Sequence, residues 1–453
     1  MKHAPLLGHA SLDEVFAYTP AGPVDVRSFL TDVGELAACL PAGNHFLNLC
    51  QDRYRFTVGL AAGLLTGRVS LQPSSQSVET LRQIQRDYAD VFCLCDCEFA
   101  TANLPRFDFP QRSVGARSGR GEPPTAIPSI PAGQLAILVF TSGSTGRPLP
   151  HGKSWGSLVI NGRAEASRLG LFDGPRHAIV GTVPPQHMYG FESTVLLAMH
   201  GNAPFWSGKP FYPLDIVAAL NRLPRPRLLV STPFHLRTLL AAGIELPAID
   251  RVLSATAPLP RELAAEAERQ LAAPLYEIYG CTESGQLASR QPTVDPVWLP
   301  FDGVHLTADG DRVLASGGHV PGQVALSDEV SILPDGRFLL GDRHTDQIGI
   351  AGKRSSLAYL NQRLLAIPGV VDGTFFQPTA SDEAIVRLCA FVVAPGIDER
   401  QLLAALREQI DAVFLPRPLF KVDALPRSAS SKLPRESLQA LYDTLRNRRD
   451  GNG

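Results

Sequence analysis

Apolar and polar residues alternate with two different periods in the first third of the chain. Residues 46–50 and 69–71 form short apolar runs of strand length, whereas residues 55–65 and 79–90 carry apolar positions at helical spacing. Strands that alternate with helices are typical of a layered α/β domain with a parallel sheet. The pattern resumes at residue 135, continues to residue 279, and includes two further predicted strands, 227–231 and 251–254.

The pattern changes twice in the second half of the chain. Residues 295–337 are short-stranded and turn-rich, which predicts a small β subdomain. After residue 343, an α+β unit of about a hundred residues is expected. Its predicted strands are 348–350, 370–376 and 388–393, and its predicted amphipathic helix is 398–413. We therefore predict an α/β protein with a large layered N-terminal domain, residues 1–342, and a smaller α+β C-terminal domain, residues 343–453.

The composition disfavours nucleic-acid binding and membrane insertion but does not indicate a specific function. The chain has 453 residues, of which 44% are hydrophobic, and a formal net charge of −2. No bulk attraction to nucleic acid or to an anionic membrane is expected from that charge. No stretch is long and apolar enough to span a bilayer, so a cytoplasmic protein is predicted.

The seven cysteines are dispersed, as expected for reduced thiols. Cys93, Cys95 and Cys97 alternate with other residues, which predicts that they share one face of a strand. Zinc ligands are usually spaced by two or more residues and need further partners. Small buried side chains are therefore favoured over a metal site.

A polar loop follows the apolar run 135–140. Residues 141–148 read Thr-Ser-Gly-Ser-Thr-Gly-Arg-Pro, with four hydroxyls, two glycines and one cation. Glycine lets backbone N–H groups approach an anion closely, and hydroxyls add donors, so the loop is typical of a phosphate cradle. The Gly-Lys-Ser/Thr of a Walker loop is not there. A polar surface turn remains the alternative when the loop is taken alone.

Four segments in order resemble the adenylate-forming superfamily, which contains acyl-CoA synthetases, peptide-synthetase adenylation domains and luciferases. The loop 141–148 resembles its phosphate loop, and Tyr279-Gly280-Cys281-Thr282-Glu283 resembles its Tyr-Gly-x-Thr-Glu motif. Asp328 with Arg343 resembles the ribose-binding region, and residues 425–435 resemble the motif of the catalytic lysine, here Lys432. Four ordered matches are far more specific than one glycine loop.

The resemblance implies ATP and Mg²⁺ as cofactors. Lys432, Glu283 and His187 would be catalytic, and Glu283 with Thr145 would hold the metal. The implied nucleotide-binding residues are Thr141, Ser142, Gly143, Ser144, Thr145, Gly146, Tyr279, Gly280, Thr282, Asp328 and Arg343. The C-terminal domain would be mobile, rotating about a hinge at Thr345.

The acid pocket is implied by residues 184–190, which resemble the family segment that places a gate beside the carboxylate. His187 would be that gate, although a structural histidine is a competing interpretation. Amino-acid-activating relatives carry Asp where this chain has Met188, so an acid without an α-amine is favoured. The implied pocket walls are His187, Met188, Phe191, Ser231, Phe234, Ala255, Thr256, Ala257 and Cys281.

The resemblance thus implies ATP-dependent activation of a carboxylic acid to an acyl-adenylate. The acid would be an aryl acid, such as a hydroxybenzoate, or a fatty acid. Transfer to a phosphopantetheine thiol of CoA or an acyl carrier protein would follow. An amino-acid loader and a non-catalytic nucleotide-binding relative are the alternatives. The family lysine after the loop proline is replaced by Leu149, so Arg147, Lys153 or Lys432 would supply the missing charge.

Overall fold

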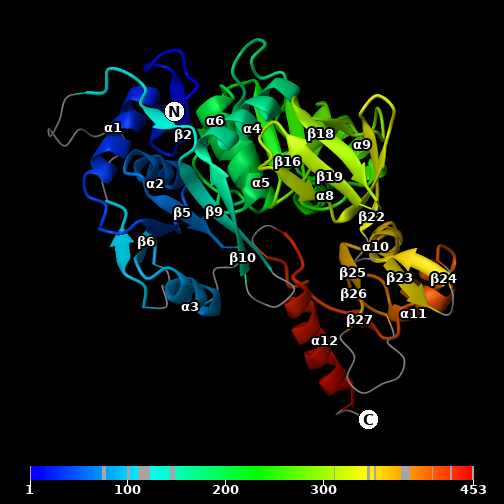
Figure 1. Ribbon diagram of the computed structural model, residues 1–453. Coiled ribbons are helices and arrows are strands. Elements are labelled where there is room, and N and C mark those ends of the chain that lie inside the picture. Colours follow the sequence, from blue (N-terminus) through cyan, green and yellow to red (C-terminus); the bar gives the residue numbers. More distant parts are fainter. Residues whose placement is uncertain are drawn as a thin grey trace. The chain divides into compact units, whose positions relative to one another are not determined.

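The structure is a computed structural model of the chain (Figure 1). It describes residues 2–73, 78–98, 103–110, 123–142, 148–310, 312–343, 347–350, 353–378, 388–410, 412–428 and 431–450. Two compact units account for these residues. Unit 1 contains Met1–Ala255, Arg261–Ala325 and Ile332–Phe338, and unit 2 contains Thr256–Pro260, Leu326–Ser331 and Leu339–Gly453. The division into an N-terminal domain, residues 1–342, and a C-terminal domain, residues 343–453, stays a prediction.

The first sheet of unit 1 has six strands in the order β10-β9-β5-β4-β6-β7. Their bounds are β4 His45–Asn48, β5 Val69–Gln72, β6 Val91–Cys95, β7 Arg106–Asp108, β9 Leu135–Ser142 and β10 Pro148–Ser154. All neighbours are parallel except β9 and β10, which form an antiparallel hairpin. The connecting helices are α2, Arg53–Leu65, and α3, Val78–Asp87. The predicted alternation of strand and helix is confirmed here.

The second sheet of unit 1 has nine strands, ordered β17-β16-β15-β14-β13-β11-β12-β2-β3. Their bounds are β2 Val15–Thr19, β3 Gly22–Asp25, β11 Ala178–Gly181, β12 Phe205–Trp206, β13 Arg227–Ser231, β14 Arg251–Ser254, β15 Leu275–Cys281, β16 Gly285–Arg290 and β17 Leu299–Pro300. The central strands are parallel, which confirms the predicted α/β class.

Helices connect the strands of the second sheet and pack in unit 1. They are α1 Val26–Ala37, α4 Trp155–Arg168, α5 Met188–Gly190, α6 Leu197–His200, α7 Pro213–Asn221, α8 Pro233–Ala241 and α9 Arg261–Leu271. Figure 1 shows α1 beside α2, and α4 beside α6. Between α5 and α6 the backbone widens into a six-residue π-helix, Phe191–Leu196. Such wide turns are rare and frequently lie at functional sites.

Small antiparallel sheets follow the second sheet, as the turn-rich sequence predicts. They comprise β18 Val304–Asp309, β19 Arg312–Gly317 and β20 Gln323–Ala325, and the pair β21 Asp328–Ile332 with β22 Phe338–Arg343. A further pair joins β1 His3–Pro5 to β8 Ser129–Pro131.

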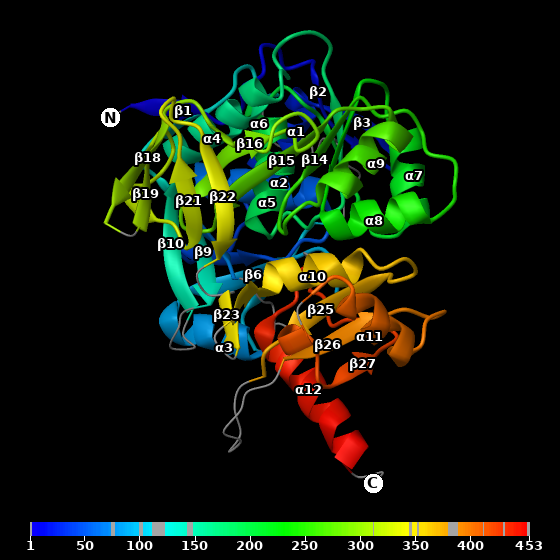
Figure 2. The same ribbon diagram turned by 90° about the vertical axis from the view of Figure 1, so that its right-hand side faces the viewer.

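Unit 2 packs helices against short antiparallel and mixed sheets (Figure 2). Its elements after residue 343 are β23 Gln347–Ile350, β24 Lys353–Ser356, α10 Leu357–Leu365, β25 Asp372–Phe376, β26 Cys389–Val393, α11 Glu399–Arg407, β27 Leu419–Lys421 and α12 Arg435–Asp450. The helix predicted over 398–413 ends earlier, at Arg407, and a separate 3₁₀ turn, Ala412–Phe414, follows. The apolar pattern continues through both pieces because both contribute to one core, with Leu402, Leu406 and Phe414 buried.

The cysteine pattern differs from the predicted one at one position. Cys93 and Cys95 are buried in β6, and burial raises the pKa of their thiols to about 12 and about 11. Cys97 lies beyond the end of β6 and is exposed, so the three thiols do not share a strand face. In the described ranges, no helix has the length and apolar character that a membrane crossing requires.

Candidate active site

The predicted Tyr-Gly-x-Thr-Glu motif forms the end of β15 and the tight turn into β16. Cys281 pairs with Gly285 across this turn, and the Ser284 hydroxyl donates to the Gly285 carbonyl at 2.8 Å. Gly280 lies so close to β16 that a Cβ there would be 2.3 Å from the Gly285 carbonyl oxygen. Thr282 and Glu283 are half-buried at the tip of the turn. Two consecutive residues at the tip therefore supply a hydroxyl and a carboxylate.

Tyr279, two residues before the turn, belongs to an aromatic cluster. Its ring centroid lies 5.7 Å from that of Trp298 and 5.8 Å from that of Phe338. The guanidinium of Arg290 lies over Trp298 at 4.5 Å from the ring centroid. These contacts fix the half-buried phenol ring, which suits the predicted role of a stacking platform.

Strand β10 contacts Glu283 with two side chains. The Lys153 ammonium donates to the backbone carbonyl of Glu283 at 2.5 Å. His151 Nε2 lies 3.9 Å from the Glu283 carboxylate. Because side chains alternate along a strand, residues 151 and 153 share one face of β10. Glu283 is thus contacted at both its backbone and its side chain.

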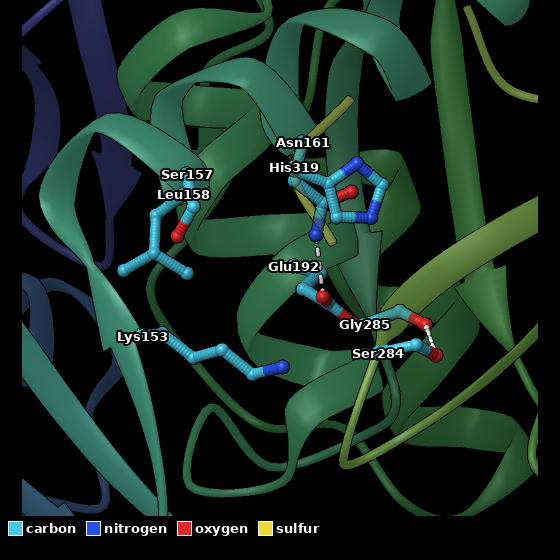
Figure 3. A pocket seen from close by; sticks show the side chains of 8 residues that line it. All are labelled: Lys153, Ser157, Leu158, Asn161, Glu192, Ser284, Gly285 and His319. Carbon is cyan, nitrogen blue, oxygen red and sulfur yellow. Dashed lines mark hydrogen bonds between the residues drawn. The ribbon is translucent and has the colours of Figure 1, made fainter. Parts of the chain in front are cut away.

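Lys153 points into a small polar cavity, shown in Figure 3. The cavity has a volume of about 10 Å³, which is the space of a single water molecule. Its lining residues are Lys153, Ser157, Leu158, Asn161, Glu192, Ser284, Gly285 and His319. Glu192 comes from the π-helix, and its carboxylate accepts from the Asn161 amide of α4 at 2.5 Å.

The charges in this cavity offset one another. Burial raises the pKa of Glu192 to about 7, and the ammonium of Lys153 opposes that rise. Burial lowers the pKa of Lys153, and the carboxylate of Glu192 is the largest opposing influence. His319 is also buried, and its pKa is lowered to about 4, so the imidazole is neutral near pH 7. An ammonium facing a carboxylate in a buried site is stabilised only while both are present.

A second buried carboxyl lies deeper in the same region. Glu165 Oε1 accepts from the Ser193 hydroxyl at 2.6 Å and from the Gln286 amide at 3.1 Å. Burial raises the pKa of Glu165 to about 8, and the negative charge of Glu192 adds to the rise. Asn161 and Glu165 are one turn apart on α4, so they meet the consecutive π-helix residues Glu192 and Ser193.

The predicted gate segment is tied to the first sheet. The Gln186 amide donates to the carbonyl of Cys50 at 2.5 Å. Arg53, the fully buried first residue of α2, donates to the carbonyls of Gly181 and Val183. It also donates to the carbonyls of Trp206 and Gly208.

The gate residues themselves follow this anchored segment. His187 and Met188 are half-buried at the start of α5. The Tyr189 hydroxyl donates to the carbonyl of Leu253 at 3.1 Å. The gate role of His187 stays a prediction.

The other predicted pocket residues have different settings. Ser231 is buried, with its hydroxyl 3.2 Å from that of Thr182, and Ala255 is buried after β14. Phe234 is half-buried, whereas Phe191 is fully buried with its ring against Phe56 in the core. Half-buried Cys281 lies in the turn already described, while Thr256 and Ala257 belong to unit 2.

Several predicted nucleotide-binding residues lie at or beyond the edge of the description. Gly143, Ser144, Thr145, Gly146 and Arg147, and the predicted hinge Thr345, lie outside the described residues. Thr141 and Ser142 end β9, and Arg343 ends β22, but their side chains are outside what the structure describes. Asp328 is half-buried at the start of β21, in unit 2.

Lys432 is exposed in unit 2, and Arg427 anchors described residues on its N-terminal side. Arg427 forms a two-pronged ion pair with Asp372 of β25, at 2.5 and 2.7 Å. The same guanidinium donates to the Ser431 carbonyl at 2.6 Å. Ser431 has a φ of +62°, in the left-handed region that favours glycine.

The sequence did not predict the buried polar residues in and next to the cavity that contains Lys153. Glu192, Asn161, Glu165 and His319 carry no motif, and they come from separate elements. One signal was available. Glu192 is the single charged residue in the otherwise uncharged run 191–199, and a charge in a buried segment requires buried partners.

The donor chemistry of the turn fits the predicted cofactors. The carboxylate of Glu283 is a hard oxygen ligand of the kind that Mg²⁺ prefers. The Thr282 hydroxyl is a donor suited to a phosphate oxygen. Both lie at the half-buried tip of the turn that follows β15, the strand that contains Tyr279.

One family model matches this chain, and the similar proteins described below are CoA ligases. The model of the family described as "AMP-binding enzyme" matches residues 52–335. A 4-coumarate–CoA ligase of Rhodobacter capsulatus is 30% identical over 281 residues, 62% of this chain and 69% of that protein. A 2-succinylbenzoate–CoA ligase of Bacillus velezensis is 24% identical over 419 residues, 85% of this chain and 84% of that protein.

A solved structure with a similar fold extends over almost the whole chain. The o-succinylbenzoate CoA synthetase (MenE) of Bacillus subtilis, in complex with ATP and magnesium ion, gives a TM-score of 0.77 at 19% identity. The match covers 97% of this chain and 100% of that one. At this identity the likeness concerns the fold.

Proposed function

This chain belongs to the AMP-binding enzyme family, and from that premise we propose that it activates an aryl carboxylic acid with ATP and passes the acyl group to a thiol. The predicted family, enzyme class and cofactors are confirmed. The observation that carries the proposal is the turn Cys281–Gly285. Its tip carries Thr282 and Glu283, and the strand that leads into it carries Tyr279, whose ring packs against Trp298.

The first half-reaction joins two anions, so the residues must neutralise charge and hold geometry. A carboxylate oxygen of the acid attacks the α-phosphorus of ATP. The bond from that phosphorus to the bridging oxygen breaks, and pyrophosphate leaves. We assign Thr282 to the α-phosphate and Tyr279 to adenine. Glu283 would hold Mg²⁺, which supplies positive charge to the phosphate oxygens when bound.

The remaining roles follow the motif positions. Thr141, Ser142, Ser144 and Thr145 would donate to the outer phosphates, with Thr145 also near the metal. Asp328 and Arg343 would hold the ribose. Lys432 would bring an ammonium to the acid and the α-phosphate, and His187 would orient the acid's carboxylate. The contact of Arg427 with Ser431, the residue before Lys432, supports this role because it limits the backbone freedom next to the lysine within unit 2.

In the second half-reaction a thiolate attacks the acyl carbonyl, the acyl–oxygen bond breaks, and AMP leaves. CoA is the acceptor supported by the two relatives described above, both of which are named CoA ligases. Transfer to an acyl carrier protein is part of our proposal as the second acceptor. We also propose a cytoplasmic location, which seven free cysteines in the structure support.

The acid is proposed to be aromatic because relatives that match 66% and 85% of this chain are named for aryl acids. Met188 lies at the gate where an α-ammonium would need a carboxylate, which disfavours an amino acid. A fatty acid remains the second candidate, since Ser231 and Ala255 leave the wall near β13 and β14 small.

The test is acid-dependent exchange of pyrophosphate into ATP. Benzoates, cinnamates, fatty acids and amino acids are compared, followed by transfer from the preferred acid to CoA and to a carrier protein. Exchange with an aryl acid and thioester formation on CoA are expected. Exchange with amino acids alone would establish a loader instead. ATP binding without exchange for any acid would establish a non-catalytic nucleotide-binding protein.

A further inference from the structure

We propose that β10 positions the turn Cys281–Gly285, with Lys153 and His151 as positioning residues for Glu283. We call these two side chains the β10 clamp. The inference rests on the proposed function in one respect: Glu283 is taken to be the metal ligand. It assigns Lys153 a role different from that of the cation expected after the phosphate loop.

Lys153 is too far along β10 to replace the missing loop cation. It pairs with Ile137 of β9, whereas Pro148 and Ser142 pair at the root of the loop. Five residues of strand separate the two places, which is about 16 Å. The ammonium is directed to the Glu283 carbonyl, and only 3% of Lys153 is exposed. Leu149, at the usual place of the cation, is 54% exposed.

The site of the ammonium is built by three other elements. Glu192 of the π-helix supplies the opposing charge, and Asn161 of α4 fixes its carboxylate by the amide hydrogen bond. Ser284 and Gly285 of the turn itself form another wall (Figure 3). A lysine with a dedicated counter-charge and a carbonyl acceptor is a built contact rather than a solvated side chain.

The turn is shaped to receive this contact. Gly285 has a φ of +82°, which disfavours any side chain. A Cβ there would also lie 2.9 Å from Glu192 Oε1 and 3.4 Å from His319. The backbone of the turn therefore lies directly against the residue that balances Lys153.

The two clamp residues act on different parts of Glu283. Lys153 fixes the peptide, and His151, on the same strand face, lies near the carboxylate. When contacts already restrict both the backbone and the side chain of a carboxylate residue, ligand binding costs it little conformational entropy. Its contribution to ligand affinity is therefore larger. The clamp should therefore matter most for ligands that use Glu283, which are metal-bound nucleotides.

The test compares Lys153→Met with Lys421→Met. Lys421 of β27 also donates its ammonium to a backbone carbonyl, that of Ile397, but it belongs to unit 2 and to no predicted site. ATP binding is measured by calorimetry with Mg²⁺ and with a chelator, and amide hydrogen exchange is followed over residues 281–286 without ligand. In Lys153→Met, affinity for ATP with Mg²⁺ should fall about tenfold or more, as for a lost hydrogen bond to a charged group. Affinity in chelator should change by less than about twofold, and exchange over 281–286 should accelerate. Lys421→Met should match wild type.

A second variant separates positioning from folding. Lys153→Met leaves the Glu192 carboxylate buried without its partner, so Lys153→Met/Glu192→Gln removes both charges. The double variant should recover the wild-type melting temperature while the Mg²⁺-dependent loss persists. Lys153→Arg, which retains a donor, should recover part of the Mg²⁺ effect.

Two outcomes would overturn the inference. Equal loss of ATP affinity with and without Mg²⁺ would make Lys153 a direct phosphate ligand. Unchanged Mg²⁺ dependence with unchanged exchange over 281–286 would make it a structural charge alone. Pyrophosphate exchange by wild type is scored separately, because its absence with every acid refutes the proposed function and leaves the binding comparison intact.

Discussion

Replacing Glu165 by Gln should remove a specific pH dependence from the stability of unit 1. Glu165 is fully buried, and burial raises the pKa of its carboxyl from the ordinary 4.5 to about 8. The folded protein therefore keeps this carboxyl protonated in a range where the unfolded chain has released the proton. That contribution to stability is complete below about pH 4.5 and is lost as the pH rises through about 8.

The size of the effect follows from the shift. Each unit of pKa difference corresponds to about 1.4 kcal/mol. Between pH 6 and pH 9 the unfolded carboxyl is ionised throughout, while the folded carboxyl passes from protonated to ionised. Wild type should lose about 2.7 kcal/mol of unfolding free energy from this group over that window. Gln accepts from Ser193 and Gln286 in the same way but does not titrate, so its contribution should be flat.

The assay is urea unfolding at pH 6 and pH 9, followed by tryptophan fluorescence. The three tryptophans, Trp155, Trp206 and Trp298, all belong to unit 1, so the signal reports that unit. The difference between wild type and Glu165→Gln at each pH cancels other titrating groups that do not interact with residue 165. A difference that stays constant within about 0.5 kcal/mol would refute a protonated Glu165, given the usual uncertainty of such extrapolations.

The other predictions concern the turn and the unit 2 loop. Lys432→Ala should slow adenylate formation by orders of magnitude while transfer from a preformed adenylate is much less affected; equal losses in both half-reactions would contradict the assigned role. Arg427→Ala should slow adenylation about tenfold, because the loop loses the anchor to Asp372, with tryptophan-monitored unfolding unchanged; a wild-type rate would show that the anchor is dispensable. Gly285→Ala should destabilise unit 1 by about 2 kcal/mol or more, because its Cβ meets the Glu192 carboxylate and φ is positive; an unchanged urea midpoint would contradict this.

The sequence does not predict β7 or β10 of the first sheet. It does predict β4, β5, β6 and β9 with helices α2 and α3, because each of these elements has its own local periodicity. It does not predict the order of the second sheet. Strand β12 pairs with β2, which places Phe205 beside Ala17, and no local pattern announces a pairing across so many residues. The helix after residue 398 shows a related limit. Its apolar spacing continues past Arg407, and the spacing does not reveal where the backbone changes.

Some features of the candidate site follow from the local sequence, whereas others depend on contacts between distant segments. Tyr279, Thr282 and Glu283 lie within five consecutive residues of one motif, so their closeness along the chain follows from the sequence. From the sequence, Lys153 is predicted only as a possible replacement for the cation missing at Leu149. Its burial and its bond to the Glu283 carbonyl depend on β10 and β15 meeting in space, and they come from different sheets.

The guanidinium of Arg53 has a consequence for protein engineering. From the first residue of α2 it donates to four carbonyls at the ends of β11 and β12, two strands of the other sheet. Exchanging the first-sheet segment for that of a relative without an equivalent arginine would leave those four carbonyls unsatisfied. Chimeras built at the boundary between the sheets should therefore retain residue 53 together with residues 181–183 and 206–208 as one inherited set.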